Sequence, residues 1–140
     1  MDIANLKNKL KVKGLKMTKP RQTILTFLIK EPGWVTAKSL HDRLADENLA
    51  IDFSTVCRNL DALTHTGILC RVDRDNNGVF VYALREIQEH HHHLICRCCG
   101  KISPIDYCPL EQIDSSHSQG FDELFCRFEL YGTCRDCQIK

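Results

Sequence analysis

The sequence contains no apolar run of the roughly 20 residues that a helix needs to cross a bilayer. Its first nine residues, MDIANLKNK, are too charged for a secretory leader, so none is expected. With 43% hydrophobic residues the chain is too apolar for general disorder, and its 140 residues suit one compact unit or two small ones. We therefore expect a small folded protein that stays in the cytoplasm and makes no membrane contact.

A strong net charge is also missing, since the whole chain carries +1. Residues 1–60 nevertheless have 11 Lys and Arg against 6 Asp and Glu, a balance of +5, whereas residues 61–140 have 8 against 12, a balance of −4. The excess is concentrated in residues 1–21, where six lysines and Arg21 accompany a single acidic residue, Asp2. Such a basic segment is typical of proteins that bind duplex DNA. A solvated helix face is the alternative interpretation.

Disulfide bonds are not expected, because nine cysteines are an odd number and a reducing compartment disfavours them. Four of the cysteines instead form two Cys-x-x-Cys knuckles, Cys96 with Cys99 and Cys134 with Cys137. Two such knuckles supply the four thiolates of a closed, tetrahedral structural zinc site. Because 34 residues separate the knuckles, this zinc would hold a whole subdomain together.

Four consecutive histidines, at 90–93, stand just before the first knuckle. Side chains alternate between the two sides of an extended backbone, so His91 and His93 should face one way and His90 and His92 the other. This short run can therefore serve two metal sites.

Apolar spacing and capping residues predict four helices in the first half of the chain. They are expected at about residues 3–13, 19–31, 37–46 and 54–66. Thr18, Thr36 and Ser54 are suited to begin the second, third and fourth of them.

A β-hairpin should follow, with strands at 68–72 and 79–83 and a turn at 75–78 whose residues suit positive φ. Short helices followed by a hairpin are typical of a winged helix-turn-helix domain, whose helix before the hairpin enters the major groove. Residues 54–66 are thus the candidate recognition helix. Its solvent side should carry the side chains that reach bases or phosphates: Thr55, Cys57, Arg58 and Asn59.

The last third of the chain predicts strands around Ile95 and Ile102, a short helix from Pro109 towards Gly120, and a strand at 125–131. The whole chain is therefore expected to be α+β. A winged helix-turn-helix domain would cover 1–84, a hinge 85–89, and a small α/β dimerisation domain 90–140. The last domain is too small to be stable by its core alone, so a structural zinc and a dimer interface are both expected.

The chain resembles the ferric uptake regulator family of metal-responsive repressors, and most of all its zinc uptake regulator branch. The resemblance rests on GLKMTKPR at 14–21, STVCRNL at 54–60, the segment 90–100, and LYGTC at 130–134 with Cys137. It implies a homodimer that represses transcription by binding a palindromic DNA operator when metal occupies the hinge. It also implies that Lys16 reaches the minor groove and Arg58 the major groove or its backbone.

The remaining DNA-binding residues expected on these segments are Arg21, Ser54, Thr55 and Cys57. Cys57 stands where the family usually has Tyr, which removes an aromatic contact and indicates a different operator sequence.

The identity of the regulatory metal is inferred from the positions at which this chain departs from the family pattern. Iron and peroxide sensors add a histidine and two carboxylates to the pair matched by His91 and His93, but Trp34, Ala83 and Pro104 stand at the three matching positions. Zinc sensors take a ligand from the segment after the recognition helix, which here is Cys70. A thiolate with two imidazoles suits zinc better than iron or manganese. The fourth ligand is left open between Glu86, Glu89 and water.

The resemblance also implies a second metal site made by His90, His92, Glu111 and Cys126. A buried structural cysteine and a solvated glutamate are the alternatives for its last two members. Cys98 and Cys108 are left without a role beyond that of spare structural thiols, although Cys98 can compete for the knuckle zinc.

Two alternative functions remain. One is an iron-, peroxide- or thiol-redox-sensing repressor of the same family, because zinc-bound thiolates can be oxidised with loss of metal. The other is a small zinc metalloenzyme, which the sequence disfavours because no deaminase or protease motif surrounds the histidines. We therefore expect no enzymatic activity and no small-molecule substrate.

Overall fold

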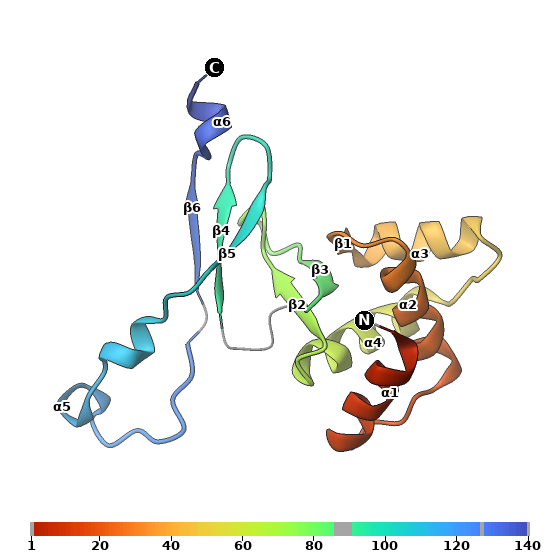
Figure 1. Cartoon of the computed structure of the whole chain (residues 1–140), viewed down its shortest axis with the longest axis horizontal. Coiled ribbons are helices and arrows are strands. Elements are labelled where there is room, and N and C mark those ends of the chain that lie inside the picture. The colour runs from red at the N-terminus through yellow and green to blue at the C-terminus, as the bar shows by residue number, and fades with distance from the viewer. Residues whose placement is uncertain (1, 86–90, 127, 140) are drawn as a thin grey trace. The chain divides into compact units, whose positions relative to one another are not determined.

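The structure, a computed structural model, describes residues 2–85, 91–126 and 128–139, and of Ser115 only the backbone (Figure 1). The described residues divide into two compact units. The first unit is made of the residues up to Asp73 together with 78–85, and the second of 74–77 together with the residues from 91 onward. Most of the expected hinge, together with Glu86, Glu89 and His90, lies outside the described residues.

The first unit contains the four predicted helices and a three-stranded antiparallel sheet of order β1-β3-β2. The helices are α1 (Ile3–Val12), α2 (Lys19–Lys30), α3 (Ala37–Asp46) and α4 (Phe53–His65). The strands are β1 (Val35–Thr36), β2 (Leu69–Val72) and β3 (Val81–Leu84). The two-residue β1 was not predicted, because so short a strand shows no alternation of polar and apolar residues.

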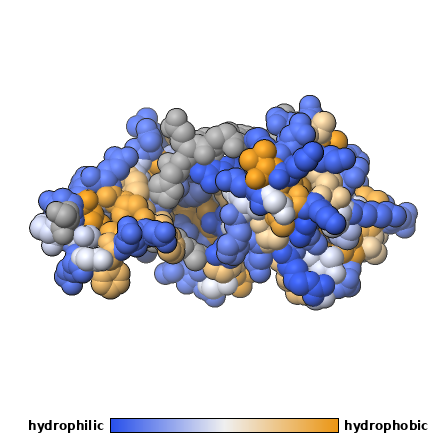
Figure 2. Space-filling view, turned by 90° about the horizontal axis from the view of Figure 1, so that it is seen from below, coloured by the Kyte–Doolittle hydropathy of each residue, from blue (hydrophilic) through white to orange (hydrophobic). Residues whose placement is uncertain are grey.

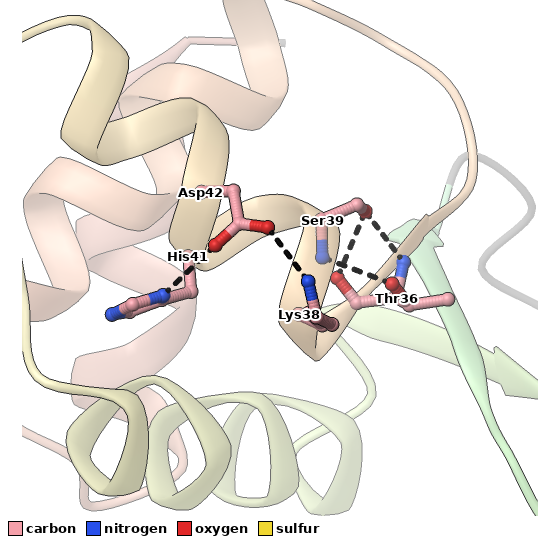
Figure 3. Close-up of polar contacts among 5 residues, drawn as sticks. All are labelled: Thr36, Lys38, Ser39, His41 and Asp42. Carbon is pink, nitrogen blue, oxygen red and sulfur yellow. Dashed lines mark hydrogen bonds and ion pairs between the residues drawn. The ribbon is translucent and has the colours of Figure 1, made fainter.

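The N-termini of α2 and α3 follow the predicted capping. The side chain of Thr18 accepts a hydrogen bond from the Arg21 N–H, and that of Thr36 accepts one from the Ser39 N–H at 3.0 Å. In turn, the Thr36 N–H donates a hydrogen bond to Ser39 Oγ at 3.0 Å, which completes a capping box (Figure 3). These side chains satisfy backbone donors that the first helical turn leaves unpaired.

The predicted cap of α4 was wrong by two residues. Asp52, and not Ser54, caps the helix, since an Asp52 carboxylate oxygen accepts a hydrogen bond from the Thr55 N–H at 3.1 Å. The same carboxylate also accepts the hydroxyls of Ser54 at 2.6 Å and Thr55 at 2.7 Å. A carboxylate has enough acceptor sites for all three donors, whereas a serine hydroxyl does not.

An apolar core holds the first unit together. The predicted inward residues Ile24, Leu40, Val56, Leu60 and Leu63 have no exposed surface. The cluster continues onto the sheet through its members Val35, Leu69 and Tyr82. The core fixes which face of α4 is turned to solvent.

The hairpin turn uses positive φ at Asn76 and Gly78, with angles of 54° and 83°, which confirms the prediction for this turn. The Gly78 N–H donates a hydrogen bond to Asp73 Oδ2 at 2.8 Å. In the β2–β3 ladder, Cys70 pairs with Ala83.

The second unit contains a sheet of order β5-β4-β6, built from β4 (His92–Cys96), β5 (Ile102–Ile105) and β6 (Glu129–Gly132). Strand β4 is antiparallel to β5 and parallel to β6, with Leu94 opposite Leu130. Because β5 returns the chain, β5 ends and β6 begins at the same end of the sheet, and the segment that joins them contains η1 (Pro109–Gln112) and α5 (Ser115–Ser118). A last short helix, α6 (Arg135–Gln138), follows β6.

Two predictions for this unit were wrong. The single helix expected from Pro109 to Gly120 is interrupted, because Ile113 and Asp114 are extended and the Asp114 side chain caps a new turn. The last strand begins at Glu129 and excludes Phe125, which exposes 79% of its surface. Periodicity alone misassigned both segments, since none of the described apolar residues between β5 and β6 is buried.

The buried side chains in the described part of the second unit are His92, Ile95 and Cys96. By contrast, Phe121 is 72% exposed, and apolar surface is visible over the end of the molecule that carries α5 (Figure 2). Within the described ranges, neither unit has a helix of the length and apolar character that crossing a membrane takes. The small core leaves the second unit dependent on other sources of stability.

Candidate metal centre and nucleic-acid interface

Four cysteine sulfurs of the second unit converge at one end of its sheet. Cys96 ends β4, Cys99 lies in the following turn, Cys134 precedes α6 and Cys137 lies within α6. Their Sγ atoms all lie within 4.8 Å of one another, with 3.8 Å between Cys96 and Cys137 and 3.8 Å between Cys99 and Cys134. A tetrahedral zinc with Zn–S bonds of about 2.3 Å places its sulfurs about 3.8 Å apart. The four residues therefore fit a structural zinc ion.

Backbone contacts bring the two knuckles together. The Arg97 N–H donates to the Gly132 carbonyl at 2.8 Å, which joins the first knuckle to the end of β6. Gly100 closes the first knuckle with φ of 78° and donates its N–H to the Cys96 carbonyl at 3.0 Å. A left-handed residue is needed at this place, and glycine adopts that conformation without steric cost.

Hydrogen bonding favours the thiolate form at Cys96. The backbone N–H groups of Cys134 and Cys99 lower the pKa of the Cys96 thiol to about 5, and the Cys134 N–H lies 3.3 Å from the sulfur. The pKa of Cys137 is raised, first because of its hydrogen bond with Cys134. Neighbouring thiolates repel one another, and a bound cation removes that repulsion.

A second cluster joins His92, Cys108 and Cys126. His92 Nε2 lies 3.2 Å from Cys126 Sγ, and Cys126 Sγ lies 3.0 Å from Cys108 Sγ. Its hydrogen bond with Cys108 raises the pKa of Cys126. The buried His92 ring packs on Phe128 with centroids 3.9 Å apart. The cluster thus places two half-buried thiols beside a buried imidazole, and all three groups can bind a metal ion.

The cluster differs in membership from the predicted second metal site. Cys108 belongs to it, although its sequence position offered no partner, because Cys108 follows β5 and Cys126 precedes β6 at the same end of the sheet. Glu111 lies exposed on η1 and belongs to no group of three or more metal-binding side chains found among the described residues. His90 lies outside those residues, and exposed Cys98 is in none of these groups either.

Of the predicted regulatory ligands, Cys70 belongs to the first unit, and His91 and His93 belong to the second. Cys70 lies half-buried on β2 of the first unit, and burial raises the pKa of its thiol while Arg85 lowers it. In the second unit, the rings of His91 and His93 meet edge to face with centroids 4.7 Å apart. The two imidazoles therefore share one side of the β4 segment, as the alternation predicted.

The exposed face of α4 carries an ordered row of polar side chains. Thr55 Oγ1 donates to Asp52, and Arg58 Nη2 donates to Thr55 Oγ1 at 3.2 Å. Hydrogen bonds from Ser54 and Thr55 lower the pKa of Asp52 to about 2, so its carboxylate stays charged near neutral pH. The row holds the exposed Arg58 guanidinium at a defined place on the helix.

Asn59 is buried and does not face solvent, where the sequence placed it. The prediction that it faces solvent was wrong, since its side chain is 7% exposed. Asn59 Nδ2 donates to the Thr55 carbonyl at 2.8 Å, and its Oδ1 accepts from Arg21 Nε at 2.9 Å. Arg21 Nη1 also donates to the Lys16 carbonyl at 2.9 Å. This chain of contacts ties the segment that carries Lys16 to α4.

A family model described as the ferric uptake regulator family matches residues 12–131. A peroxide-responsive repressor of Staphylococcus saprophyticus is 32% identical in an alignment of 130 residues that covers 91% of this chain and 85% of that protein. The ferric uptake regulator of Francisella tularensis, solved with iron, is 28% identical with a TM-score of 0.64, over 89% of this chain and 96% of that one.

A zinc uptake regulator, solved with zinc and DNA, shares the fold with a TM-score of 0.75 at 22% identity, over 97% of this chain and 92% of that one. Together with the residues matched by the family model, these similarities cover both units. The chain belongs to the ferric uptake regulator family of metal-responsive repressors.

Proposed function

We propose that the protein is a zinc-responsive transcriptional repressor that binds a palindromic DNA operator as a homodimer when zinc occupies a regulatory site. The observation that carries the DNA-binding part is the hydrogen-bonded row on the exposed face of α4, which ends in Arg58. A helix that precedes a hairpin in a winged helix-turn-helix domain is the one that enters the major groove. A regulator of this kind acts where its DNA is, in agreement with a cytoplasmic location.

The proposed DNA contacts divide between two segments. Arg58 is exposed on α4 and can bind guanine or a phosphate, while the exposed Lys16 ammonium can bind phosphates or the minor groove. Arg21 takes a supporting part, because two of its nitrogens already donate to Asn59 and to the Lys16 carbonyl. Ser54, Thr55 and half-buried Cys57 complete the proposed contact surface of α4.

The choice of zinc rests on ligand chemistry. Cys70, His91 and His93 offer one thiolate and two imidazoles, a set that suits zinc better than the oxygen-preferring metals. At the positions where iron sensors carry further ligands, the chain has Trp34, Ala83 and Pro104, and none of these side chains binds metal. Glu86, Glu89 or water would supply the fourth ligand.

The proposed zinc would act by selecting a conformation. Cys70 belongs to the first unit and the two histidines to the second, so one ion bound by all three would link the units. Opening such a link removes at least one ligand, which gives zinc a higher affinity for the linked form. The linked form would be the one that binds the operator.

The remaining metal sites and the homodimer complete the proposal. The tetrathiolate would hold a structural zinc, and His92 with Cys126, and with the predicted His90 and Glu111, would form the second site. The exposed apolar residues of the second unit, which include Phe121 and Phe125, offer surface for a partner subunit. No enzymatic activity is proposed.

Selection from a random duplex library in the presence of zinc would identify the operator, and fluorescence anisotropy would measure its affinity against free zinc. Tight binding should require zinc beyond the structural ion. Cys70→Ser and His91→Ala should keep the tetrathiolate zinc and the dimer but need far more free zinc. A response to zinc equal to that of the parent in both variants would contradict the proposed site.

The same titration tests the DNA-binding face. Arg58→Ala should weaken operator binding by about 1–3 kcal/mol, or roughly 5- to 150-fold, if it contacts a base. Lys101→Ala is the charge-matched control, because Lys101 is an exposed cation of the second unit. Parent-like affinity of Arg58→Ala would exclude α4 as the recognition helix.

An iron-, peroxide- or thiol-redox-sensing repressor is the second candidate, because a relative at 32% identity is a peroxide-responsive repressor. It predicts that iron or manganese restores operator binding to metal-depleted protein better than zinc does. It also predicts that peroxide abolishes binding while zinc is in excess. The zinc proposal predicts the opposite result in both measurements.

A further inference from the structure

Cys108 and Cys126 lie at a separation unlike that of the zinc knuckles. Their sulfurs are 3.0 Å apart, whereas the paired sulfurs of the tetrathiolate are 3.8 Å apart. Two sulfurs of a tetrahedral zinc site need about 3.8 Å, and two sulfurs of a disulfide need about 2.05 Å. The pair therefore lies between the two spacings, about 0.8 Å closer than zinc requires and about 1 Å farther apart than a disulfide bond. An approach of about 1 Å would bring the sulfurs to bonding distance.

The surroundings of the pair permit that approach. Cys108 stands just before η1 and makes no side-chain cap to it, and Cys126 precedes β6. Neither residue lies within a helix or a strand ladder, although the Cys108 carbonyl accepts a hydrogen bond from the Glu111 N–H at 3.3 Å. A rotation of the two side chains can bring the sulfurs closer without breaking that bond. Both side chains are half-buried, which keeps them within reach of a small molecule.

We propose that Cys108 and Cys126 are a redox-active dithiol that closes reversibly into an intramolecular disulfide by exchange with a low-molecular-weight disulfide. The inference goes beyond the proposed function, because it requires neither an operator nor metal at Cys70. It assigns a modification site to two residues that the sequence spacing left unconnected.

The exchange proceeds in two steps. The thiolate of one cysteine attacks a sulfur of the small disulfide, so that a mixed disulfide forms and one small thiolate leaves. The thiolate of the second cysteine then attacks the protein-side sulfur, which forms the Cys108–Cys126 bond and releases the second small thiolate. Two electrons pass from the protein sulfurs to the small disulfide. The two protons lost by the protein thiols end on the two released thiols.

Closure would have a direct chemical consequence. It consumes both sulfur ligands of the His92 cluster, so the oxidised protein cannot hold a metal ion there through thiolates. The tetrathiolate should be spared, because its sulfurs belong to another cluster and are engaged by zinc in the loaded protein. The disulfide and a metal ion at this cluster are therefore mutually exclusive.

Peptide mapping tests the proposal without any variant. Trypsin cleavage after Lys101 and Arg127 yields a fragment, 102–127, that contains Cys108 and Cys126 and no other cysteine. Full-length protein with one zinc per chain would be treated with oxidised glutathione, alkylated and digested. We expect this fragment to appear without alkyl groups and about 2 Da lighter than its reduced form. A reductant, but not EDTA, should restore its alkylation, and zinc content should not change.

Matched variants identify the partners. Cys108→Ser and Cys126→Ser should each lose the closed fragment and accumulate glutathione on the remaining thiol, while keeping the tetrathiolate zinc and the circular dichroism of the parent. Cys98→Ser should behave as the parent does, because exposed Cys98 belongs to neither cluster.

Three results would overturn the proposal. The first is a fragment 102–127 from the oxidised parent that still takes two alkyl groups. The second is a mixed glutathione disulfide that persists on the parent without closing. The third is release of zinc in step with thiol loss, which would show that the knuckles oxidise first. If a serine variant does not fold, the map of the parent alone decides.

Discussion

Leu10, Leu40 and Leu60 of the first unit have no exposed surface, whereas Phe121 and Phe125 of the second unit expose 72% and 79% of theirs. The first unit packs four helices and a small sheet around one apolar cluster. The second unit has a sheet of similar size, but His92, Ile95 and Cys96 are its buried side chains in the described part of the chain. Two adjacent segments of one chain thus differ in how far their own side chains stabilise them.

The difference shows that secondary structure alone does not determine stability. Burial of apolar surface contributes roughly 25 cal/mol per Å², and the first unit obtains this from within itself. The second unit has four convergent thiols, whose spacing of 3.8 Å fits zinc, and exposed apolar side chains that suit a partner subunit. Its stability should therefore depend on metal and on dimerisation.

The largest effect is expected from Cys99→Ser. Structural zinc contributes about 10–16 kcal/mol of binding free energy in small zinc domains, which is largely folding free energy. The variant should lose its tightly held zinc and the folded second unit, and with it the dimer. Most helical circular dichroism should remain, since α1 to α4 belong to the first unit.

Metal analysis and analytical ultracentrifugation would measure these losses. Cys98→Ser is the matched control, since this exposed neighbour lies in the same turn but outside the tetrathiolate. A zinc-free, dimeric Cys99→Ser protein with the full circular dichroism of the parent would disprove the dependence of the second unit on metal.

A smaller effect is expected from Leu60→Ala in the core of the first unit. Loss of a fully buried leucine side chain should lower the free energy of unfolding by about 2–5 kcal/mol, through lost burial and a residual cavity. Zinc content should stay that of the parent. Urea unfolding monitored by helical circular dichroism would measure the change.

Val12→Ala is the control for the core variant, because Val12 is 84% exposed at the end of α1 and should change stability little. Equal stabilities of the two variants would show that the apolar cluster does not hold the first unit together. Loss of zinc from Leu60→Ala would show instead that the two units do not fold independently.

The smallest effect concerns the cap of α4. The pKa of Asp52 is about 2 in the folded protein, because of hydrogen bonds from Ser54 and Thr55, and an aspartate in an unfolded chain has a pKa of about 3.9. The charged cap thus contributes stability that is fully present above about pH 4 and is lost as the pH falls towards 2.

Asp52→Asn tests this contribution, since asparagine is also a good cap but does not titrate. The difference in unfolding free energy between the parent and Asp52→Asn should shrink as the pH is lowered from 5 to 2.5. Comparison of the two proteins cancels the loss of zinc that acid causes in both. A difference that stays constant over this range would exclude Asp52 as the group responsible.

Features that depend on local spacing could be predicted from the residues alone. The four helices follow from apolar periodicity and from caps such as Thr18 and Thr36, and the hairpin turn follows from residues that accept positive φ. The tetrathiolate was predictable because each knuckle is a short motif whose two thiols can bind the same metal ion. The family resemblance followed from the same short motifs.

Features that depend on distant segments or on competition between neighbours became apparent in the folded structure. Asp52 replaced Ser54 as the cap of α4 because its carboxylate accepts three donors at once. Asn59 became buried because Arg21, 38 residues away in sequence, donates to it. Cys108 met Cys126 because β5 ends and β6 begins at the same end of the sheet, so the residue after one strand and the residue before the other lie close together. Local spacing holds no information about such contacts, since chain closure brings them together only after the elements have packed.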